Sequence, residues 1–177
     1  DRVTIQMFEA NLDVHLLEIQ RKLMERRYEP QPVRRVYIPK GLDTKKLRPL
    51  GVPTVADRIV GQALLQILDP LFDSQLSERS FGFRKGRKAR DAVATVLRDK
   101  HEGFCSVLDA DIASFFDRLD HQVVMSCVRR RIADGRVLDL IEAFLKAGVY
   151  EDGVVSIPSV GSPQGGVISP WLANLVL

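Results

Sequence analysis

The sequence predicts an α+β protein that is mostly helical, with one basic β-hairpin and a few further strands. Apolar residues recur at helical spacing through much of the chain. Two β-branched, basic segments at 33–39 and 46–50 flank a turn, and Asp152-Gly153 between two valine-containing runs is the strongest hairpin signal. The 177 residues, 45% of them hydrophobic, can bury a core and fit one domain or two small subdomains.

The first hundred residues are expected to form a helix, a hairpin, two further helices and a short helical segment between them. Thr4 is a candidate cap for the first helix, which a proline-rich segment ends. Asp69-Pro70 is expected to end the next long helix, whose residues Ile59, Ala63 and Ile67 share one face. The expected elements are a helix at 4–27, strands at 33–39 and 46–50 around a turn at 41–44, a helix at 55–68, a short helical segment at 71–76 and a helix from 89 to about 100.

The remaining residues are expected to alternate between strands, helices and glycine-rich loops. The apolar run Phe104-Cys105-Ser106-Val107-Leu108 predicts a buried strand. Cys105 and Cys127 are the only cysteines, so no disulfide framework is implied and both are expected in the core. The expected elements are a basic loop at 80–88, the strand at 104–108, helices at 121–132 and 136–146, a hairpin at 149–156, and a loop at 158–170 before a last helix.

Charge is distributed unevenly along the chain. The net charge of +3 and the pI near 9.0 are modest for a nucleic-acid binder, so the distribution is more informative than the total. This distribution predicts that the first part holds phosphate and that the acidic segment at 109–120 holds metal. The cations of the first part are Arg21, Lys22, Arg26, Arg27, Arg34, Arg35, Lys40, Lys45, Lys46 and Arg48.

The sequence contains no legible export signal or membrane span. Its first residues lead directly into an amphipathic helix, and no apolar run is long enough to cross a bilayer. We therefore expect an intracellular, reducing location and no membrane partner. The start without methionine and the end inside a helical pattern at 174–177 suggest an excised piece of a larger protein.

An acidic segment follows the expected buried strand. Asp109, Asp111 and Asp117 lie at or just after the strand's end, where open sheets place their chemistry. Hard carboxylate oxygens suit Mg²⁺, which keeps waters and binds substrate phosphates. Acidic residues after a strand also commonly cap the next helix or lie in solvent, so this segment alone leaves both interpretations open.

Two basic segments are candidates for phosphate binding. Lys40 and Arg48 lie on the expected hairpin, where an ammonium and a guanidinium could close over a triphosphate. Charged edge strands also protect against aggregation, which is the alternative for this hairpin. Arg84, Lys85 and Arg87 form a second basic group. Gly82 and Gly86 let backbone amides approach a phosphate there. Phe81 and Phe83 are expected to pack in the core under the loop, and contact with a nucleic-acid sugar is the alternative.

A glycine- and proline-rich loop precedes the last helix. In Gly161-Ser162-Pro163-Gln164-Gly165-Gly166, so many conformationally special residues favour a backbone shaped for close contact, with Gln164 offering a donor and an acceptor to a nucleotide. A plain helix-entry loop is the alternative. His15, His101 and His121 show no metal-ligand spacing and are expected at the surface or in caps. No phosphate loop or Ser-His-Asp arrangement is legible.

Taken together and in order, these motifs resemble those of the group II intron reverse transcriptases and their bacterial relatives. The resemblance covers nearly the whole chain. It implies a right-hand polymerase, with a fingers subdomain at 1–100 and a partial palm at 101–177, although the helices after His121 could belong to either. The motifs are Ile38-Pro39-Lys40, Arg48-Pro49-Leu50-Gly51-Val52-Pro53-Thr54-Val55-Ala56-Asp57-Arg58, Ser80-Phe81-Gly82-Phe83-Arg84, Asp109-Ala110-Asp111-Ile112 with Phe116-Asp117, and Ser162-Pro163-Gln164-Gly165-Gly166 through Leu172-Ala173-Asn174.

The same resemblance implies roles for single residues. Asp111 corresponds to the first catalytic, metal-binding aspartate, with the Ile112 carbonyl as a further metal ligand. For Asp109, both metal binding and local hydrogen bonding are left open. Phe116 corresponds to the ring that excludes a 2′-hydroxyl and so favours deoxynucleotides. Lys40 and Arg48 correspond to residues that hold the triphosphate, and Gln164 to one that contacts the nucleotide or template. The implied cofactor is Mg²⁺.

The family's second acidic motif, Tyr-x-Asp-Asp, does not occur within the 177 residues. We therefore expect a parent protein that is a reverse transcriptase and a fragment that is inactive alone. The implied partners are an RNA template, including intron RNA, a DNA primer and deoxynucleoside triphosphates, and the implied location is the bacterial cytoplasm. The fragment is also expected to self-associate through uncovered palm surface.

A different class of function is also compatible with the resemblance. Relatives of this type act as RNA-binding splicing cofactors, called maturases, so the basic first part could serve mainly to grip folded intron RNA. The sequence beyond Leu177 would separate the two, because an intact Tyr-x-Asp-Asp motif favours a polymerase. A role of the parent in CRISPR adaptation or phage defence differs in partner more than in chemistry.

Overall fold

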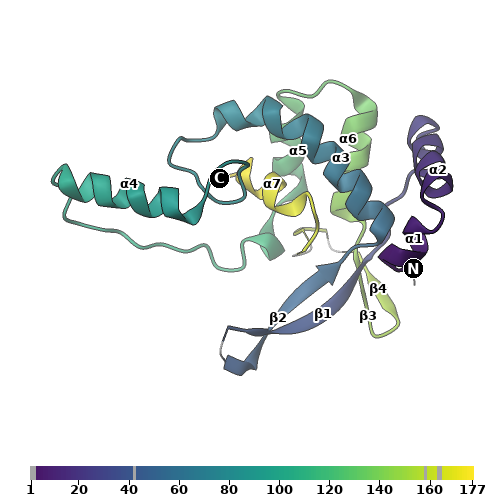
Figure 1. Cartoon of the computed structure of the whole chain (residues 1–177), viewed down its shortest axis with the longest axis horizontal. Coiled ribbons are helices and arrows are strands. Elements are labelled where there is room, and N and C mark those ends of the chain that lie inside the picture. Colours follow the sequence, from purple (N-terminus) through teal and green to yellow (C-terminus); the bar gives the residue numbers. More distant parts are fainter. Residues whose placement is uncertain (1–2, 42, 158, 163–164) are drawn as a thin grey trace.

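The computed structural model describes residues 3–41, 43–157, 159–162 and 165–177, and it has the α+β class that the sequence predicts. Helices form one layer and a small twisted sheet lies below them in the view of Figure 1. In chain order the elements are α1 (Ile5–Glu9), α2 (Leu12–Met24), β1 (Val33–Lys40), β2 (Asp43–Val52), α3 (Val55–Phe72), the 3-10 turn η1 (Asp73–Gln75), α4 (Ala89–His101), the 3-10 turn η2 (Phe116–Arg118), α5 (His121–Arg129), α6 (Gly135–Lys146), β3 (Val149–Glu151), β4 (Val154–Ser156) and α7 (Ser169–Asn174).

The expected first helix is two helices. Thr4 caps α1 by accepting a hydrogen bond from the Met7 amide, as predicted. The helix then breaks at Ala10 and Asn11, and the Phe8 and His15 rings stack at 4.6 Å. Residues seven apart lie about 10 Å apart along a continuous helix, so this stack requires the break. The prediction of a single helix at 4–27 was therefore wrong.

The four strands form one sheet in the order β2-β1-β3-β4. β1 and β2 make the predicted antiparallel hairpin, and β3 and β4 make the second one. The second turn has positive φ at both Asp152 (47°) and Gly153 (86°), which matches the twist of the flanking strands. β1 pairs in parallel with β3, Val33 opposite Val149 and Arg34 opposite Tyr150, so the two hairpins share one sheet.

α3 is longer than predicted and buries a different face. Thr54 caps its start, and the helix continues through Pro70 to Phe72. Phe72 is buried and its ring meets that of Trp171 edge-on at 5.2 Å, so packing at the end of the helix outweighs the missing amide of Pro70. Val60, Leu64 and Leu68 form the buried face, whereas Ile67 is 67% exposed.

The core lies where α3, α5, α6 and α7 meet. Its fully buried side chains include Val124, Ile141 and Leu172, each 0% exposed. α3 belongs to the predicted fingers and the other three helices follow residue 100, so core and sheet both join the two predicted subdomains. The predicted boundary near residue 100 stays a prediction. None of the helices among the described residues is both long and apolar enough to cross a membrane.

The predicted buried strand at 104–108 is absent. α4 has no buried residue and projects from the helical layer, and the chain then returns as an extended coil (Figure 1). Val107 and Leu108 are 86% and 91% exposed. A strand needs a neighbour for its backbone groups, and no described strand lies beside this segment. Cys105 is accordingly exposed rather than in the core.

Candidate active site

The predicted metal-binding segment is exposed in the structure. Asp109, Asp111 and Ile112 all lie on the extended coil that precedes η2, and Ile112 is 57% exposed. The Asp111 carboxylate and the Ile112 carbonyl are hard oxygen donors of the type Mg²⁺ prefers. Among the described residues, however, no group of three or more Asp, Glu, His or Cys side chains gathers closely enough to hold a metal. The donor set therefore fits Mg²⁺ in kind, but is incomplete here.

Phe116, the predicted sugar gate, lies in a tight turn that other motifs hold in place. Ser114 adopts a positive φ of 52° just before η2, and the rings of Phe115 and Phe116 meet at 5.8 Å. The Ser162 amide donates to the Phe116 carbonyl at 2.8 Å, and the Gly161 amide donates to the Leu119 carbonyl at 2.7 Å. The turn after the acidic segment and the glycine-rich loop are thus one hydrogen-bonded unit.

Gly161 is enclosed by this unit. Its φ is +92°, and a Cβ there would lie 2.7 Å from the Asp117 carbonyl oxygen. Its own carbonyl is 2.6 Å from Nε2 of His121, a histidine that is only 9% exposed. His121 was expected at the surface or in a cap. Instead it is buried at the start of α5, where it joins that helix to the loop.

The same loop also contacts the end of the basic hairpin. Gly165 has a φ of +104°, and a Cβ there would overlap the Gly51 carbonyl oxygen near the end of β2. Only glycine allows this approach without displacing the backbone. Gln164, the predicted nucleotide contact, is next to Gly165 in sequence and lies outside the described residues. Three motifs far apart in sequence therefore converge on one loop.

Lys40 and Arg48 lie on the two strands of the hairpin, β1 and β2, whose β2 strand contacts the loop at Gly51. Arg48 pairs with Ile38 across the ladder, and Lys40 follows two residues later, beyond a register shift between Pro39 and Lys40. Both side chains are exposed, and neither forms a hydrogen bond or ion pair with another described residue. By contrast, Arg21 and Lys22 on α2 pair with glutamates one turn away. The hairpin cations are therefore the more available of the two groups.

In the basic loop at 80–88, Arg84 is a structural residue in this conformation. Its side chain is 3% exposed, and its guanidinium donates to the Asp73 carboxylate at 2.8 Å and to the carbonyls of Asp73, Ser77 and Ser80. The hydrogen bond from Arg84 lowers the pKa of Asp73 and raises that of Arg84 itself. With its donors engaged inside the loop, Arg84 does not present them to a phosphate.

The other residues of the loop remain on its surface or are half-buried. Lys85 is exposed, while Arg87 lies over the Phe81 ring at 5.7 Å and donates to the Glu78 carbonyl. Phe83 is 71% exposed, so the expectation that both phenylalanines pack in the core was wrong for this one. Sequence spacing could not separate Arg84 from Lys85, because only the fold decides which cation turns inward.

A network of hydrogen bonds around a buried carboxylate at the base of the hairpin was not predicted. Asp57 is 3% exposed and accepts hydrogen bonds from the Tyr28 hydroxyl (2.8 Å), the Thr54 hydroxyl (2.6 Å) and the Gln31 amide (3.2 Å). Burial, and then the neighbouring Asp57 charge, raise the pKa of Tyr28. Thr54 and Asp57 have the spacing of a capping box, which was the available sequence signal.

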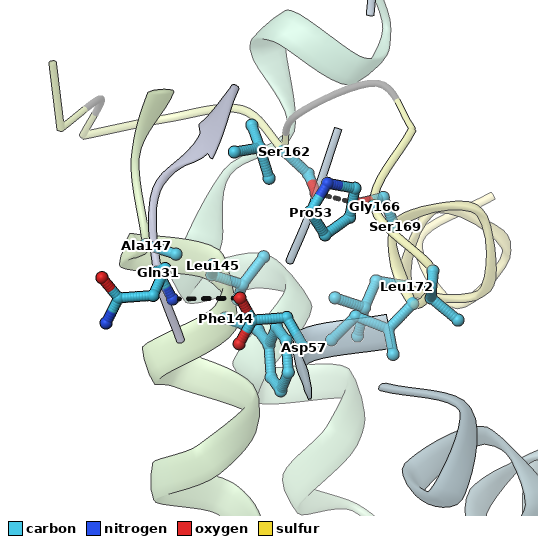
Figure 2. Close-up of a pocket in the computed structure, with 13 residues that line it drawn as sticks. Gln31, Pro53, Asp57, Phe144, Leu145, Ala147, Ser162, Gly166, Ser169 and Leu172 are labelled. Carbon is cyan, nitrogen blue, oxygen red and sulfur yellow. Dashed lines mark hydrogen bonds between the residues drawn. The ribbon is translucent and has the colours of Figure 1, made fainter. Parts of the chain in front are cut away.

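A small cavity lies beside this network (Figure 2). Asp57 and Gln31 line one side, and Ser162 and Ser169, whose hydroxyls are 2.7 Å apart, line the other. Its volume of about 30 Å³ is close to that of a single water molecule, so it cannot hold a nucleotide. The cavity marks a packing junction between hairpin, α6 and α7, and the candidate active site is the exposed surface around Phe116 and the glycine-rich loop.

Comparisons with known proteins all point to reverse transcriptases or their relatives. The profile described as "Reverse transcriptase (RNA-dependent DNA polymerase)" matches residues 38–177. Protein YkfC of Escherichia coli (strain K12) is 42% identical over 181 residues, which cover 100% of this chain and 47% of that protein. The group II intron-encoded protein LtrA of Lactococcus lactis subsp. cremoris is 38% identical, covering 90% of this chain and 26% of LtrA.

A further relative and a solved structure also match the chain, and the structure shows the fold. Nuclear intron maturase 1, mitochondrial, of Arabidopsis thaliana is 37% identical over 53% of this chain and 13% of its own length. A chain of the structure titled "Partial Cas6-RT-Cas1--Cas2 complex" has the same fold, with a TM-score of 0.60 at 24% identity, covering 93% of this chain and 28% of that one. The chain spans less than half of the length of these relatives. It belongs to the reverse transcriptase (RNA-dependent DNA polymerase) family, within the group II intron reverse transcriptases and maturases.

Proposed function

We propose that the whole protein carrying these residues synthesises DNA on an RNA template. In this reaction, the 3′-hydroxyl of a DNA primer attacks the α-phosphate of a deoxynucleoside triphosphate, and pyrophosphate leaves. The observation that carries the proposal is the convergence on one loop: Gly161 and Ser162 hold the turn at Phe116, and Gly165 meets the hairpin at Gly51. Family membership supports the same chemistry.

The hairpin cations serve the triphosphate in this proposal. Lys40 and Arg48 are exposed and unpaired among the described residues, on a two-stranded arm that ends beside the glycine-rich loop. A guanidinium binds phosphate through two parallel hydrogen bonds, and an ammonium adds a point charge. Together they orient the triphosphate and offset its charge as the α-phosphate reacts.

The acidic segment supplies the metal ligands. Asp111 contributes its carboxylate and Ile112 its carbonyl oxygen, and Mg²⁺ bound there would neutralise charge that develops on the reacting phosphate. Phe116 would lie under the sugar and exclude a 2′-hydroxyl. The hydrogen bond from the Ser162 amide to the Phe116 carbonyl would hold its backbone in position. Gln164 would contact the nucleotide or the template from the loop.

Residues 1–177 are proposed to bind RNA without polymerising. Two-metal catalysis clamps the attacking and leaving oxygens between two ions, which requires carboxylates from more than one segment. The described residues gather no such group, and Tyr-x-Asp-Asp does not occur in the sequence. Lys40, Arg48, Lys85 and Arg87 are nevertheless all present, so phosphate binding does not depend on the missing motif.

A second candidate function is RNA binding in support of splicing. Two relatives are named intron maturases, and apart from the buried Arg84 the cations Lys40, Arg48, Lys85 and Arg87 are exposed or half-buried on the surface. Such a protein would grip folded intron RNA through phosphates and shape, independently of Asp111.

Primer extension by the whole protein, with an RNA template and a DNA primer, separates the two functions. Magnesium-dependent extension that Asp111→Asn abolishes supports the polymerase. RNA binding without extension, unaffected by Asp111→Asn, supports the splicing cofactor and contradicts the polymerase proposal.

A further inference from the structure

Phe83 has an unusual combination of exposure and backbone conformation. Its ring is 71% exposed, and its φ is +54°, in the left-handed region that residues with a bulky side chain rarely adopt. A large apolar side chain in a strained conformation at the surface is not explained by core packing. Such outliers concentrate where a binding surface requires them.

The residues on both sides of Phe83 are fixed. The Asn174 side-chain amide donates to the Gly82 carbonyl at 2.9 Å and ties the loop to α7, 92 residues further along the chain. On the other side, Arg84 is anchored by its four hydrogen bonds to Asp73, Ser77 and Ser80. The loop therefore holds the Phe83 backbone in place with the ring pointing outward. Because this segment is already ordered, it loses little further conformational entropy when a ligand binds.

The ring borders a groove whose chemistry suits a nucleobase. The groove, of about 560 Å³, lies between the exposed face of α3, the loop and the start of α7. Gln62 and Gln66, one helical turn apart, offer amide donors and acceptors, and Lys85 offers a cation. Asp69 is the one acidic residue among those that line it, and the loop at 80–88 contains four cations and no acid.

We propose that Phe83 is a stacking platform for an unpaired base of single-stranded RNA. Lys85, two residues away, contacts a neighbouring phosphate, and the amides of Gln62 and Gln66 meet the edge of the base. Aromatic rings bind single strands by stacking because every base has a π-face, which makes the contact tolerant of sequence. A duplex keeps its bases stacked on each other, so Phe83 contributes to single-strand binding alone. The inference rests on the proposed RNA binding.

The test measures affinities of the 177-residue protein and its variants for an unstructured single-stranded RNA and for an RNA duplex, by fluorescence anisotropy. We expect Phe83→Leu to weaken single-strand binding about fivefold or more and to leave duplex binding unchanged. Phe83→Trp should stay within about twofold of the wild type, because it keeps a stacking ring. Phe104→Leu is the matched control: its ring is also exposed, at 66%, but lies outside the loop. It should leave both affinities unchanged.

Phe83→Gly distinguishes a binding role from a structural one. Glycine adopts a positive φ freely, which offsets its larger loss of conformational entropy on folding, so this variant should melt close to the wild-type temperature while losing single-strand affinity like Phe83→Leu. A lower melting temperature together with unchanged affinity would make Phe83 a packing residue and overturn the inference. Equal single-strand affinities for the wild type, Phe83→Leu and Phe104→Leu would also overturn it, even if salt-sensitive RNA binding persists and supports the proposed function. No RNA binding by the wild type at any salt concentration would overturn both.

Discussion

The Ser162 amide donates a 2.8 Å hydrogen bond to the carbonyl of Phe116, and so the loop that precedes α7 fixes the turn that follows the acidic segment. The neighbouring bond from Gly161 to Leu119 makes this a two-point attachment. A shift of the loop that keeps both hydrogen bonds must therefore move the backbone of Phe116. In the proposed reaction, we therefore expect the loop to influence sugar selection as well as nucleotide contact.

Asp111→Asn in the whole protein should abolish primer extension and leave RNA binding nearly intact. The substitution removes negative charge where the reacting phosphate is stabilised, at an exposed position where it should not disturb folding. Rates of extension with Mg²⁺ and RNA affinity are measured in parallel. Asp109→Asn, two residues earlier and also exposed, is the matched control and should retain much more activity. Extension by Asp111→Asn at a near wild-type rate would contradict its role.

Phe116→Val in the whole protein should raise the efficiency of ribonucleotide incorporation relative to deoxynucleotide. Discrimination by a ring rests on steric exclusion, and a smaller side chain relaxes it by roughly tenfold or more. The ratio of kcat/KM values for the two sugars is the measurement. Phe115→Val is the control, because the two rings are in contact but only Phe116 is assigned to the sugar. If only the control variant changes the ratio, Phe115 is the gate.

The protein of residues 1–177 should bind RNA in a salt-sensitive way and fail to extend a primer. Log affinity should fall with log salt at a slope of about 0.9 per phosphate neutralised in duplex and about 0.7 in single strands. Arg48→Ala should lower this slope by about one phosphate, whereas Arg21→Ala, on α2, should not. Filter binding across a salt series and primer extension with Mg²⁺ are the measurements. Robust extension would show that the active site is complete within these residues.

Asp73→Asn should reduce the stability of the fold at neutral pH and make its stability less dependent on pH in the acidic range. The hydrogen bond from Arg84 holds the pKa of Asp73 below its usual value. A carboxylate with a lowered folded pKa stabilises the fold above its unfolded pKa of about 3.9, and this contribution is lost as pH falls through the lower folded value. Melting temperatures from pH 7 to pH 3 should therefore fall more steeply for the wild type. Parallel curves for both proteins would show that the pair contributes nothing.

Gly161→Ala should destabilise the protein more than Gly153→Ala. Both glycines have positive φ, which costs an alanine about 1–2 kcal/mol. At Gly161 the new Cβ also meets the Asp117 carbonyl, whereas at Gly153 there is no atom within 4 Å. Gly153→Ala thus measures backbone strain alone, and the difference between their free energies of unfolding measures the close approach. Equal losses would mean that the loop and the turn can separate without cost.

The sequence correctly predicted the features that depend on interactions between residues close together in the chain. The two hairpins follow from turn residues and β-branched strands, and Thr4 caps its helix because a hydroxyl three residues ahead of an amide suffices. Pro70 shows the limit, since the contact between Phe72 and Trp171 outweighs the proline's preference and depends on a residue about a hundred positions away. The segment at 104–108 is strand-like in sequence but has no neighbour to pair with in the described structure.

For the candidate site, too, some features could be predicted from the sequence and others could not. Its residue types could be found from the sequence because they occur in recognisable motifs, but their arrangement could not. Nothing in the sequence indicates that Arg84 turns inward while Phe83 turns outward, because this depends on the carbonyls of Ser77 and Ser80 and on Asn174. The contact of Gly165 with Gly51 is likewise a property of the tertiary fold.

The parallel pairing of β1 with β3 has a consequence for how the chain is made. β1 and β2 are neighbours in sequence and can close as a hairpin soon after they leave the ribosome. The other edge of β1 pairs with β3, whose residues are synthesised much later. The hydrogen bond between Tyr37 and Glu151 illustrates this separation, because the two residues are 114 positions apart. Until then the nascent hairpin carries an open edge, exposed to pairing with other chains. Pairing with β3 then covers this edge of β1.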